Sequence, residues 1–319
     1  MDRAISKLIW SPYTKGYYEN PYKHLNDCRE NNPIHVGSHG SWMLFKHKDV
    51  SKILRSNDFD VSNLSEYLAE KEPYIFKNSN ACPYLSKPTS KWPMYLNGSD
   101  NKSIRSIIGK SFKIFDIRKA VSNAVEAINI KFNGQHDLDL VDYCAEFVFF
   151  VIKDFLDIKD YKSIEHIKKY SNLLAKSQDI NVPKQTYHQI NDAFIWGKKI
   201  FEESNYREAI ISLSKELGLE FNDDELYSIL SIAFMAAFET SKDNLSIALY
   251  EVLKSPELID YVLQCDSKSL NILIEELLRF SSPLQYTVRI NKEQIMLNGI
   301  VIPKRSKLYL CIASANRDP

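Results

Sequence analysis

Residues 223–254 are the stretch that most constrains how this chain of 319 residues can fold. Acidic residues fill positions 223–225, where carboxylates favour the positive end of a helix, and Lys254 precedes a Ser-Pro stop signal. A helix of about 30 residues would be about 45 Å long, comparable with the diameter of a domain. Because residues 226–238 are apolar on almost every side, we expect this helix to run through the core.

Polar residues interrupt this apolar helix in its middle. Glu239 and Thr240 follow directly after the small pair Ala236 and Ala237. In one interpretation Thr240 hydrogen-bonds back to the Ala236 carbonyl, and Glu239 faces a cleft or water. In the other, a flat ligand lies against the two alanines while Glu239 and Thr240 handle protons beside it. The residues alone leave both interpretations open.

Composition excludes several classes of protein. The chain has 41 basic and 41 acidic residues, and this balance argues against a nucleic-acid or membrane-surface partner attracted by charge. Its 5 cysteines stand singly, which is typical of a reduced, cytoplasmic protein. The first residues lack the apolar segment of a signal peptide, and no apolar run reaches the roughly 18 residues that a membrane helix needs. No metal-ligand spacing occurs, so we expect no metal site built from side-chain motifs.

Hydrophobic periodicity places the remaining elements. It predicts helices at residues 21–31, 48–55, 99–112, 115–132, 138–158, 161–178, 187–215, 256–264 and 267–279. Segments rich in β-branched and aromatic residues predict strands at 34–36, 41–45, 286–290, 294–297, 300–302 and 307–312. An Asn-Gly dipeptide at 298–299 predicts a tight hairpin. The expected fold is a mainly α-helical single domain with a small β-region at each end.

Residues 56–98 show no periodicity and are rich in aromatic residues and proline. A loop of this length inside a compact domain is uncommon and is usually functional or mobile. The aromatic residues could line a pocket for an organic molecule, or they could belong to a flap that packs its own side chains. The sequence does not decide between the two.

Several stretches, in this order along the chain, resemble the bacterial cytochromes P-450, the haem-thiolate monooxygenases. The motifs that carry the resemblance are NPYKHLNDCRENNPIHV at 20–36, GSWMLFKHKDVSKILRS at 40–56, AAFETS at 236–241, IEELLRFSSP at 274–283, YTVRI at 286–290 and GIVIPKRSKLYLCIASANRDP at 299–319. The resemblance covers essentially the whole chain. It implies a triangular helical fold with small β-regions, a haem b cofactor and an activity that oxidises a small organic substrate.

The resemblance also implies roles for the polar residues of the central helix. Haem would lie against Ala236 and Ala237, where small side chains let a flat ring approach. Thr240 would hydrogen-bond the oxygen that haem activates, and Glu239 would help to relay protons to it. These two residues are therefore the implied catalytic pair.

Two arginines are implied to bind the haem propionates. They are Arg105 and Arg289, and both should reach the same pocket because they serve one cofactor. Asn101 stands one turn before Arg105, where the family usually has a histidine. Glu276 and Arg279 match the Glu-x-x-Arg pair of the family, which is implied to be a structural ion pair beneath the haem.

The family's cysteine-ligand loop and last long helix have no counterpart among residues 1–319, so the resemblance implies a single P-450-like domain that is truncated at its C-terminus. Cys311 stands in a predicted strand, which is the wrong context for the ligand. We therefore expect apolar residues on the 226–252 face of the central helix to be left exposed. We expect one of three outcomes: a dimer or protein partner covers that face, the face is locally disordered, or further residues cover it.

Three functional hypotheses remain open. The chain is an incomplete monooxygenase served by a ferredoxin-type redox partner; it is a haem-free homologue that binds and activates another biosynthetic enzyme; or it is a fragment without a function of its own.

Overall fold

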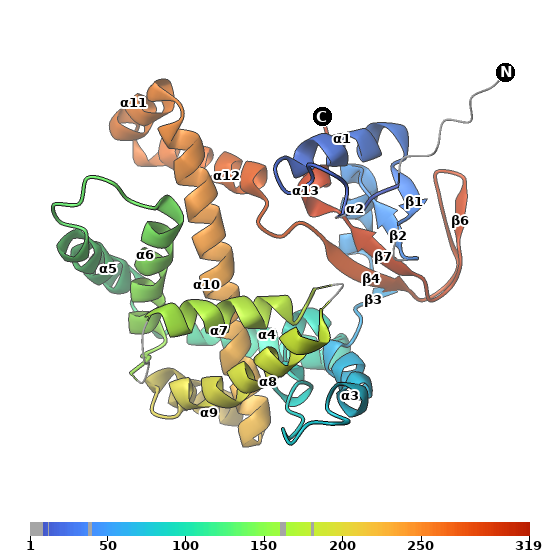
Figure 1. Ribbon diagram of the computed structural model, residues 1–319, viewed down its shortest axis with the longest axis horizontal. Coiled ribbons are helices and arrows are strands. Elements are labelled where there is room, and N and C mark those ends of the chain that lie inside the picture. The colour runs from blue at the N-terminus through green and yellow to red at the C-terminus, as the bar shows by residue number, and fades with distance from the viewer. Residues whose placement is uncertain (1–8, 12, 38–39, 160–163, 180–181) are drawn as a thin grey trace. The chain divides into compact units, whose positions relative to one another are not determined.

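The computed structural model describes residues 9–11, 13–37, 40–159, 164–179 and 182–319. The chain divides into two compact units, one made of residues 1–62 with 247–319 and the other of residues 63–246. Helices dominate the described residues of both, as the sequence predicts. Figure 1 shows the elements with their labels.

The first unit contains the β-structure. Its elements are α1 (Pro21–Asn31), β1 (Ile34–Val36), β2 (Trp42–Leu44), α2 (His47–Arg55), β3 (Phe59–Asp60), α11 (Pro256–Gln264), α12 (Ser267–Ser281), β4 (Thr287–Asn291), β5 (Ile295–Leu297), β6 (Ile300–Ile302), β7 (Lys307–Leu310) and α13 (Ile312–Ala315). Five strands form a sheet in the order β1-β2-β7-β4-β3, in which only the β2–β7 pairing is parallel. Strands from the two ends of the chain therefore share one sheet, and the β-regions predicted at each end are confirmed as one structure.

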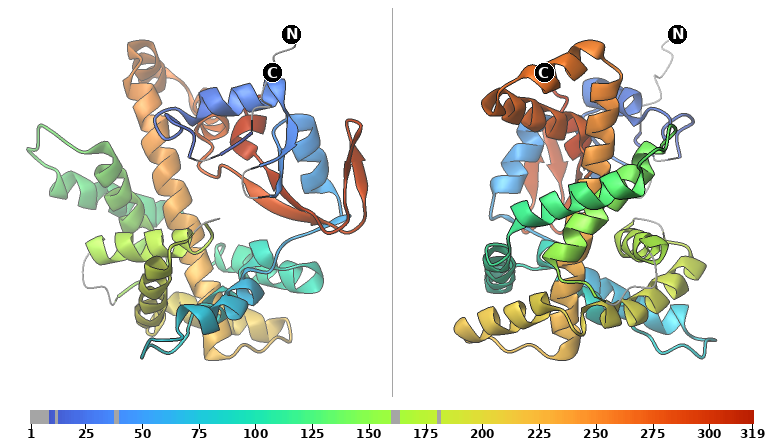
Figure 2. Two further views of the ribbon diagram at one scale, coloured as in Figure 1. Left: turned by 45° about the vertical axis from the view of Figure 1, so that its right-hand side comes forward. Right: turned by 90° about the vertical axis from the view of Figure 1, so that its left-hand side faces the viewer.

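Strands β5 and β6 form the hairpin that the Asn-Gly dipeptide predicts. Asn298 and Gly299 have φ angles of 48° and 78°, which are the positive values that a two-residue hairpin turn requires. The Asn298 amide also donates a hydrogen bond of 3.1 Å to the Asp49 carboxylate. Figure 2 shows this hairpin projecting from the larger sheet. The sheet packs a small apolar core that includes the fully buried Leu44 and Leu308.

The second unit is helical. Its elements are α3 (Leu64–Ile75), η1 (Lys87–Thr89), η2 (Pro93–Tyr95), α4 (Gly98–Ser111), α5 (Ile117–Lys131), α6 (Leu140–Phe155), α7 (Ile164–Lys176), α8 (Lys184–Gly197), η3 (Lys198–Phe201), α9 (Asn205–Glu216) and the greater part of α10 (Asp223–Leu253). Its core is rich in aromatic rings, and Trp92, Phe149, Phe194, Phe234 and Phe238 are completely buried there.

Helix α10 is one continuous helix, as predicted, and Figure 1 draws it as an uninterrupted ribbon. Asn222 caps it, because the Asn222 Oδ1 atom accepts hydrogen bonds of 3.0 Å from the backbone of Asp224 and Glu225. The Glu225 carboxylate accepts one of 3.1 Å from the Asn222 backbone, which completes a capping box. Every residue from 226 to 235 is buried, so this part of α10 is the axis of the helical core.

Two sequence predictions are wrong. Residues 64–75 were expected to be part of a loop, but they form α3, which Asn63 caps through a hydrogen bond of 3.2 Å from the Glu66 backbone. Proline usually indicates the end of a helix, so Pro73 makes the helix hard to recognise in the sequence, although it does not interrupt the helix. The long helix predicted at 187–215 is divided into α8, η3 and α9, because Ser204 caps a new helix. Part of the helix predicted at 161–178 lies outside the described residues.

Candidate functional site

The middle of α10 carries the residues that the sequence singles out. Ala236 and Thr240 are exposed and lie one turn apart on one face of the helix, whereas Ala237 and Glu239 are partly buried. The Thr240 hydroxyl donates a hydrogen bond of 2.6 Å to the Ala236 carbonyl oxygen. This is the local bond that the sequence offered as one of its two interpretations. The bond occupies the hydroxyl proton but leaves the small side chain of Ala236 open to an approaching group.

Glu239 has a partner that sequence analysis missed. Lys242, one turn later, places its Nζ atom 2.8 Å from the Glu239 carboxylate, and the two side chains are only 17% and 15% exposed. Burial by itself lowers the pKa of the Lys242 ammonium, but the bonds to Glu239 and Asp243 outweigh burial and raise it. The signal was present in the sequence, because a glutamate and a lysine three residues apart on a helix commonly pair.

Helix α4 carries Asn101 and Arg105 one turn apart. The Asn101 side-chain amide donates to the backbone oxygen of Pro93, and so it fastens α4 to η2. Arg105 is exposed, and its guanidinium has no hydrogen-bond or ion-pair partner among the described residues. Arg105 is therefore free to bind an anion from solution.

Arg289 lies on β4, in the other unit. Its guanidinium donates hydrogen bonds to the Val288 carbonyl at 2.8 Å and to the Thr287 hydroxyl at 3.3 Å. Burial lowers the pKa of Arg289, and no carboxylate within the described part of the chain pairs with it. A partly desolvated guanidinium without a counter-ion favours the binding of a carboxylate. That Arg105 and Arg289 reach one pocket stays a prediction.

The Glu276–Arg279 pair differs from the expectation. The pair exists on α12, with the Arg279 Nε atom 2.7 Å from the Glu276 carboxylate, but the side chains are 56% and 45% exposed. The Arg279 guanidinium also donates to the Asn316 carbonyl oxygen, so its partners come from α12 and the segment after α13. The resemblance implies a structural pair beneath the haem, whereas among the described residues the pair is a surface contact, because α12 buries only Ser281.

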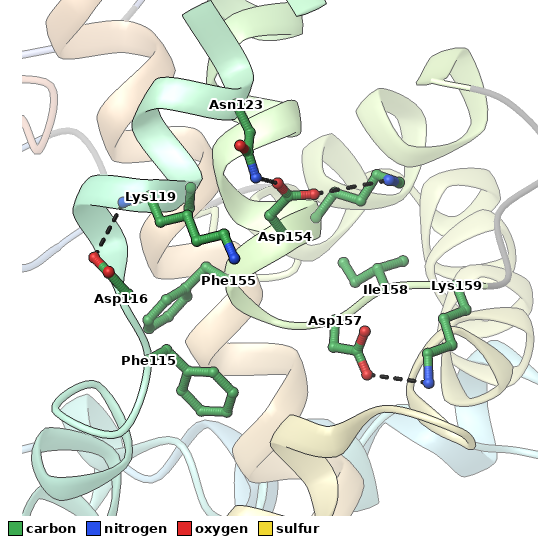
Figure 3. A pocket seen from close by; sticks show the side chains of 11 residues that line it. Phe115, Asp116, Lys119, Asn123, Asp154, Phe155, Asp157, Ile158 and Lys159 are labelled. Atoms are coloured by element: carbon green, nitrogen blue, oxygen red, sulfur yellow. Dashed lines mark hydrogen bonds and ion pairs between the residues drawn. The ribbon is translucent and has the colours of Figure 1, made fainter.

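Residues 236–240 of α10 do not line the depression that Figure 3 shows. Figure 3 shows a depression of about 630 Å³ between α5, α6 and the turn that follows α6. Its three carboxylates are already engaged: Asp116 caps α5, Asp154 accepts from Asn123 at 2.8 Å, and Asp157 pairs with Lys159 at 3.2 Å. Each acidic side chain of this depression therefore already has a partner.

Three of the five cysteines are buried in surroundings that disfavour a thiolate. All 5 are free, and burial raises the pKa of the Cys28 and Cys311 thiols to about 12. Burial also raises the pKa of Cys144. A metal ligand must be a thiolate, so these three thiols are poor candidates for an axial ligand. No group of three or more His, Cys, Asp or Glu side chains among the described residues could hold a metal ion.

Comparisons with known proteins find distant matches over most of the chain. No family model matches the chain. Epothilone C/D epoxidase of Sorangium cellulosum is 24% identical over 328 residues, which are 97% of this chain and 76% of that protein. A polyketide biosynthesis cytochrome P-450 of Bacillus subtilis (strain 168) is 22% identical over 335 residues, which are 99% of this chain and 80% of that protein. The chain is a distant homologue of the bacterial cytochromes P-450.

Solved structures support the same fold. The crystal structure of CalO2 matches 98% of this chain and 79% of its own, with a TM-score of 0.80 and 16% identity. A cytochrome P-450 in complex with acyl carrier protein ligated to hexadec-9Z-enoic acid matches 95% of this chain and 79% of its own, with a TM-score of 0.77 and 20% identity. The mainly helical P-450 fold with small sheets, expected from the resemblance, is confirmed. Among the described helices, none has the length and apolarity to cross a membrane.

Haem, which the cytochrome P-450 family implies, fits part of this set of residues. Taken one at a time, the open side of Ala236 is compatible with the face of a ring, and the guanidiniums of Arg105 and Arg289, which pair with no carboxylate among the described residues, are each compatible with a propionate. The protonated thiols of Cys28, Cys144 and Cys311 do not fit the axial position. Single described residues thus suit a propionate or the ring face, whereas none of these three buried thiols suits the iron.

Proposed function

We propose that the chain acts in a cytochrome P-450-type monooxygenase, which uses haem-dependent oxygen activation to hydroxylate or otherwise oxidise a small organic substrate. The observation that carries the proposal is the AAFETS run on a continuous, core-forming α10 in a P-450 fold. The thiolate that this haem chemistry needs would come from a group other than Cys28, Cys144 or Cys311. The working protein would be cytoplasmic and would receive electrons from a ferredoxin-type partner.

Haem, when bound, supplies the oxygen-activating chemistry in this proposal. The contribution of the chain is to position the group and to handle protons. Arg105 and Arg289 would neutralise its carboxylates, and Ala236 with Ala237 would let it approach α10. Thr240 would rotate its hydroxyl away from the Ala236 carbonyl, at the cost of a local bond of 2.6 Å, to donate a proton toward the substrate side.

Glu239 would serve as the proton reservoir behind Thr240. Its carboxylate is engaged by Lys242 at 2.8 Å, so the ammonium would have to share or release the carboxylate during proton transfer. Replacement of Lys242 by Gln should therefore speed or slow the proton-dependent step without altering the substrate site. Its expected signature is a shift in the pH profile of turnover, with the affinity for substrate unchanged.

The test is the absorption spectrum of the protein isolated from its own cells. If the proposal is right, the spectrum shows stoichiometric haem with the signature of thiolate ligation after reduction and binding of carbon monoxide. A protein that contains no haem after growth with a haem precursor contradicts the proposal. Loss of haem in Arg289→Gln, with Arg305→Gln as an exposed control from the same unit, would support the assigned role of Arg289.

A second function is favoured by specific observations. Thr240 and Glu239 both have local partners, Asn101 is engaged by a backbone oxygen, and none of the three buried thiols is suited to iron. These features suit a haem-free homologue that binds and activates another biosynthetic enzyme. In that case the isolated protein lacks haem and co-purifies with a defined enzyme, whose activity falls when this chain is deleted.

A further inference from the structure

A short irregular segment is held in place by side chains from outside it. Residues 77–86, here called the strap, connect α3 to η1 and contain no helix or strand. At one end of the strap the Glu72 Oε1 atom of α3 accepts hydrogen bonds of 2.8 Å from the backbone of both Leu85 and Ser86. The Ser86 hydroxyl donates to the same oxygen at 3.0 Å. One carboxylate therefore replaces the backbone pairing that a strand would provide.

Helix α8 holds the middle of the strap through Asn191. The Asn191 Oδ1 atom accepts a hydrogen bond of 2.7 Å from the Tyr84 backbone, and its Nδ2 atom donates one of 3.3 Å to the Cys82 carbonyl oxygen. Asn191 is completely buried, so these two bonds satisfy a polar side chain that would otherwise be costly to bury. The strap is thus fitted to α8 as well as to α3.

The third attachment is a cluster of charged groups around Asp224, at the start of α10. The Asp224 Oδ1 atom accepts a hydrogen bond of 2.6 Å from the Tyr84 hydroxyl and lies 3.1 Å from Lys198 Nζ. Its Oδ2 atom lies 3.2 Å from Lys87 Nζ. We call these four residues the latch, because they join the strap, the first residue of η1, the residue after α8 and α10 through one carboxylate.

The latch is open to solvent. The side chain of Lys87 is 61% exposed and that of Asp224 is 27% exposed. Exposed ion pairs weaken as dissolved salt screens their charges, over about 10 Å at about 0.1 M ionic strength. The latch should therefore loosen as the salt concentration rises.

Residues 88–96 are attached differently. Trp92 is completely buried and donates its indole hydrogen bond to the buried Ser231 hydroxyl at 3.1 Å. The Lys91 backbone donates to the buried Ser228 hydroxyl at 2.8 Å. In the strap, by contrast, only Leu85 is fully buried. Little apolar surface opposes opening of the strap, whereas opening of residues 88–96 would expose a tryptophan.

We propose that Asp224 is the centre of an ionic latch, and that the strap opens as one segment when this latch is broken while residues 88–96 stay in place. The strap end and Lys87 line a cavity of about 760 Å³ together with α3 and the start of α10. Opening of the strap removes one wall of this cavity. The opening of the strap responds to ionic strength. The strap and the latch consist only of residues of this chain, so their behaviour does not depend on haem.

Hydrogen exchange of the 319-residue protein, read by mass spectrometry, tests the proposal. The test variant is Asp224→Asn. Its control is Asp223→Asn, which removes the same charge from the same helical turn but pairs with Arg207, outside the latch. In Asp224→Asn, exchange in peptides from the strap should rise about tenfold at low salt, because a local opening equilibrium sets that rate. Peptides from 88–96 should be unchanged, and the control should behave as the parent protein.

Salt supplies the second measurement. In the parent protein, raising the ionic strength from about 0.02 M to about 0.5 M should increase exchange in the strap alone, and Asp224→Asn should lose this response. Lys87→Gln, a change at an exposed side chain, should give a smaller increase of the same pattern. The proposal is overturned if exchange in the strap is equal in Asp224→Asn and Asp223→Asn, or if exchange rises equally throughout residues 63–246.

Discussion

Thr240 donates its hydroxyl hydrogen bond to the carbonyl oxygen of Ala236, one turn back along α10, at 2.6 Å. A residue that is implied to contact haem and one that is implied to hydrogen-bond oxygen are thus hydrogen-bonded to each other. The bond satisfies the Thr240 hydroxyl, but the helix does not need this bond in order to form.

Thr240→Ala should therefore leave the stability of the chain within about 0.5 kcal/mol of the parent, because alanine has the higher helix propensity. Urea denaturation followed by circular dichroism measures this. A loss of several kcal/mol would mean that Thr240 supports the fold. If stability is unchanged, any loss of oxygenation in the same variant reflects the hydroxyl group itself.

Gly197→Ala should destabilise the helical unit by about 1–3 kcal/mol, because a side chain there overpacks the core. A Cβ atom at this position would lie 2.2 Å from the Tyr170 ring and 2.6 Å from the Tyr227 hydroxyl oxygen. The matched control is Gly109→Ala in α4, where no atom lies within 4 Å and helix propensity should add about 0.5–1 kcal/mol. Equal effects of the two changes would contradict the packing around Tyr170.

Ser231→Ala should cost about 1–3 kcal/mol, because it leaves the buried indole N–H of Trp92 without an acceptor. In Trp92→Phe that N–H is absent, so the same serine change should cost less. A double-mutant cycle measures the difference, which should be about 1 kcal/mol. Strict additivity of the two changes would show that the bond contributes nothing.

The pH dependence of stability should report Asp224. Burial alone would raise the pKa of this carboxyl, but the hydrogen bond from Tyr84 and the ammonium groups of Lys198 and Lys87 outweigh burial and lower the pKa to about 2, from the ordinary 3.8. A carboxyl whose pKa is lowered by folding stabilises the protein at pH values above its unfolded-state pKa of 3.8. This stabilisation is lost as the pH falls through the folded-state pKa of about 2. Because the Asp224 side chain is 27% exposed, solvent screening keeps the contribution below what the shift alone implies.

Denaturation of the parent and of Asp224→Asn at several pH values measures this. The parent should be the more stable protein near neutral pH, and the difference should shrink between the two pKa values, 3.8 and about 2. A difference that stays constant or grows with acid would contradict the assignment.

Glu276→Gln should not measurably change the denaturation midpoint at neutral pH, because its pair with Arg279 is a surface contact. The hydrogen bond from Arg279 lowers the pKa of Glu276, so the pair persists through the neutral range. Thermal denaturation of the variant beside the exposed control Glu275→Gln tests this. A markedly lower midpoint for Glu276→Gln alone would indicate that the pair is buried in the working protein.

The sequence by itself determined the features that depend on neighbouring residues. The acidic first turn at 223–225, the apolar run that follows it and the Asn298-Gly299 turn all depend on residues close together in sequence, so they can be recognised in the sequence alone. The sequence analysis does not predict the helix at 64–75, and the reason also lies in neighbouring residues, because Pro73 near its end is typical of a loop. The ordered motifs were sufficient to indicate the P-450 fold.

Only the tertiary structure decided which side chains meet. Nothing in the local pattern of residues 77–86 shows that Asn191 and Asp224, more than 100 residues away, would hold them, or that Trp92 would find Ser231. Exposure of the Glu276–Arg279 pair was likewise invisible, because a Glu-x-x-Arg spacing is the same on a buried and on an exposed helix. Local propensity acts through the backbone within one or two turns, whereas burial and partner choice depend on contacts between distant segments that form only when the chain folds.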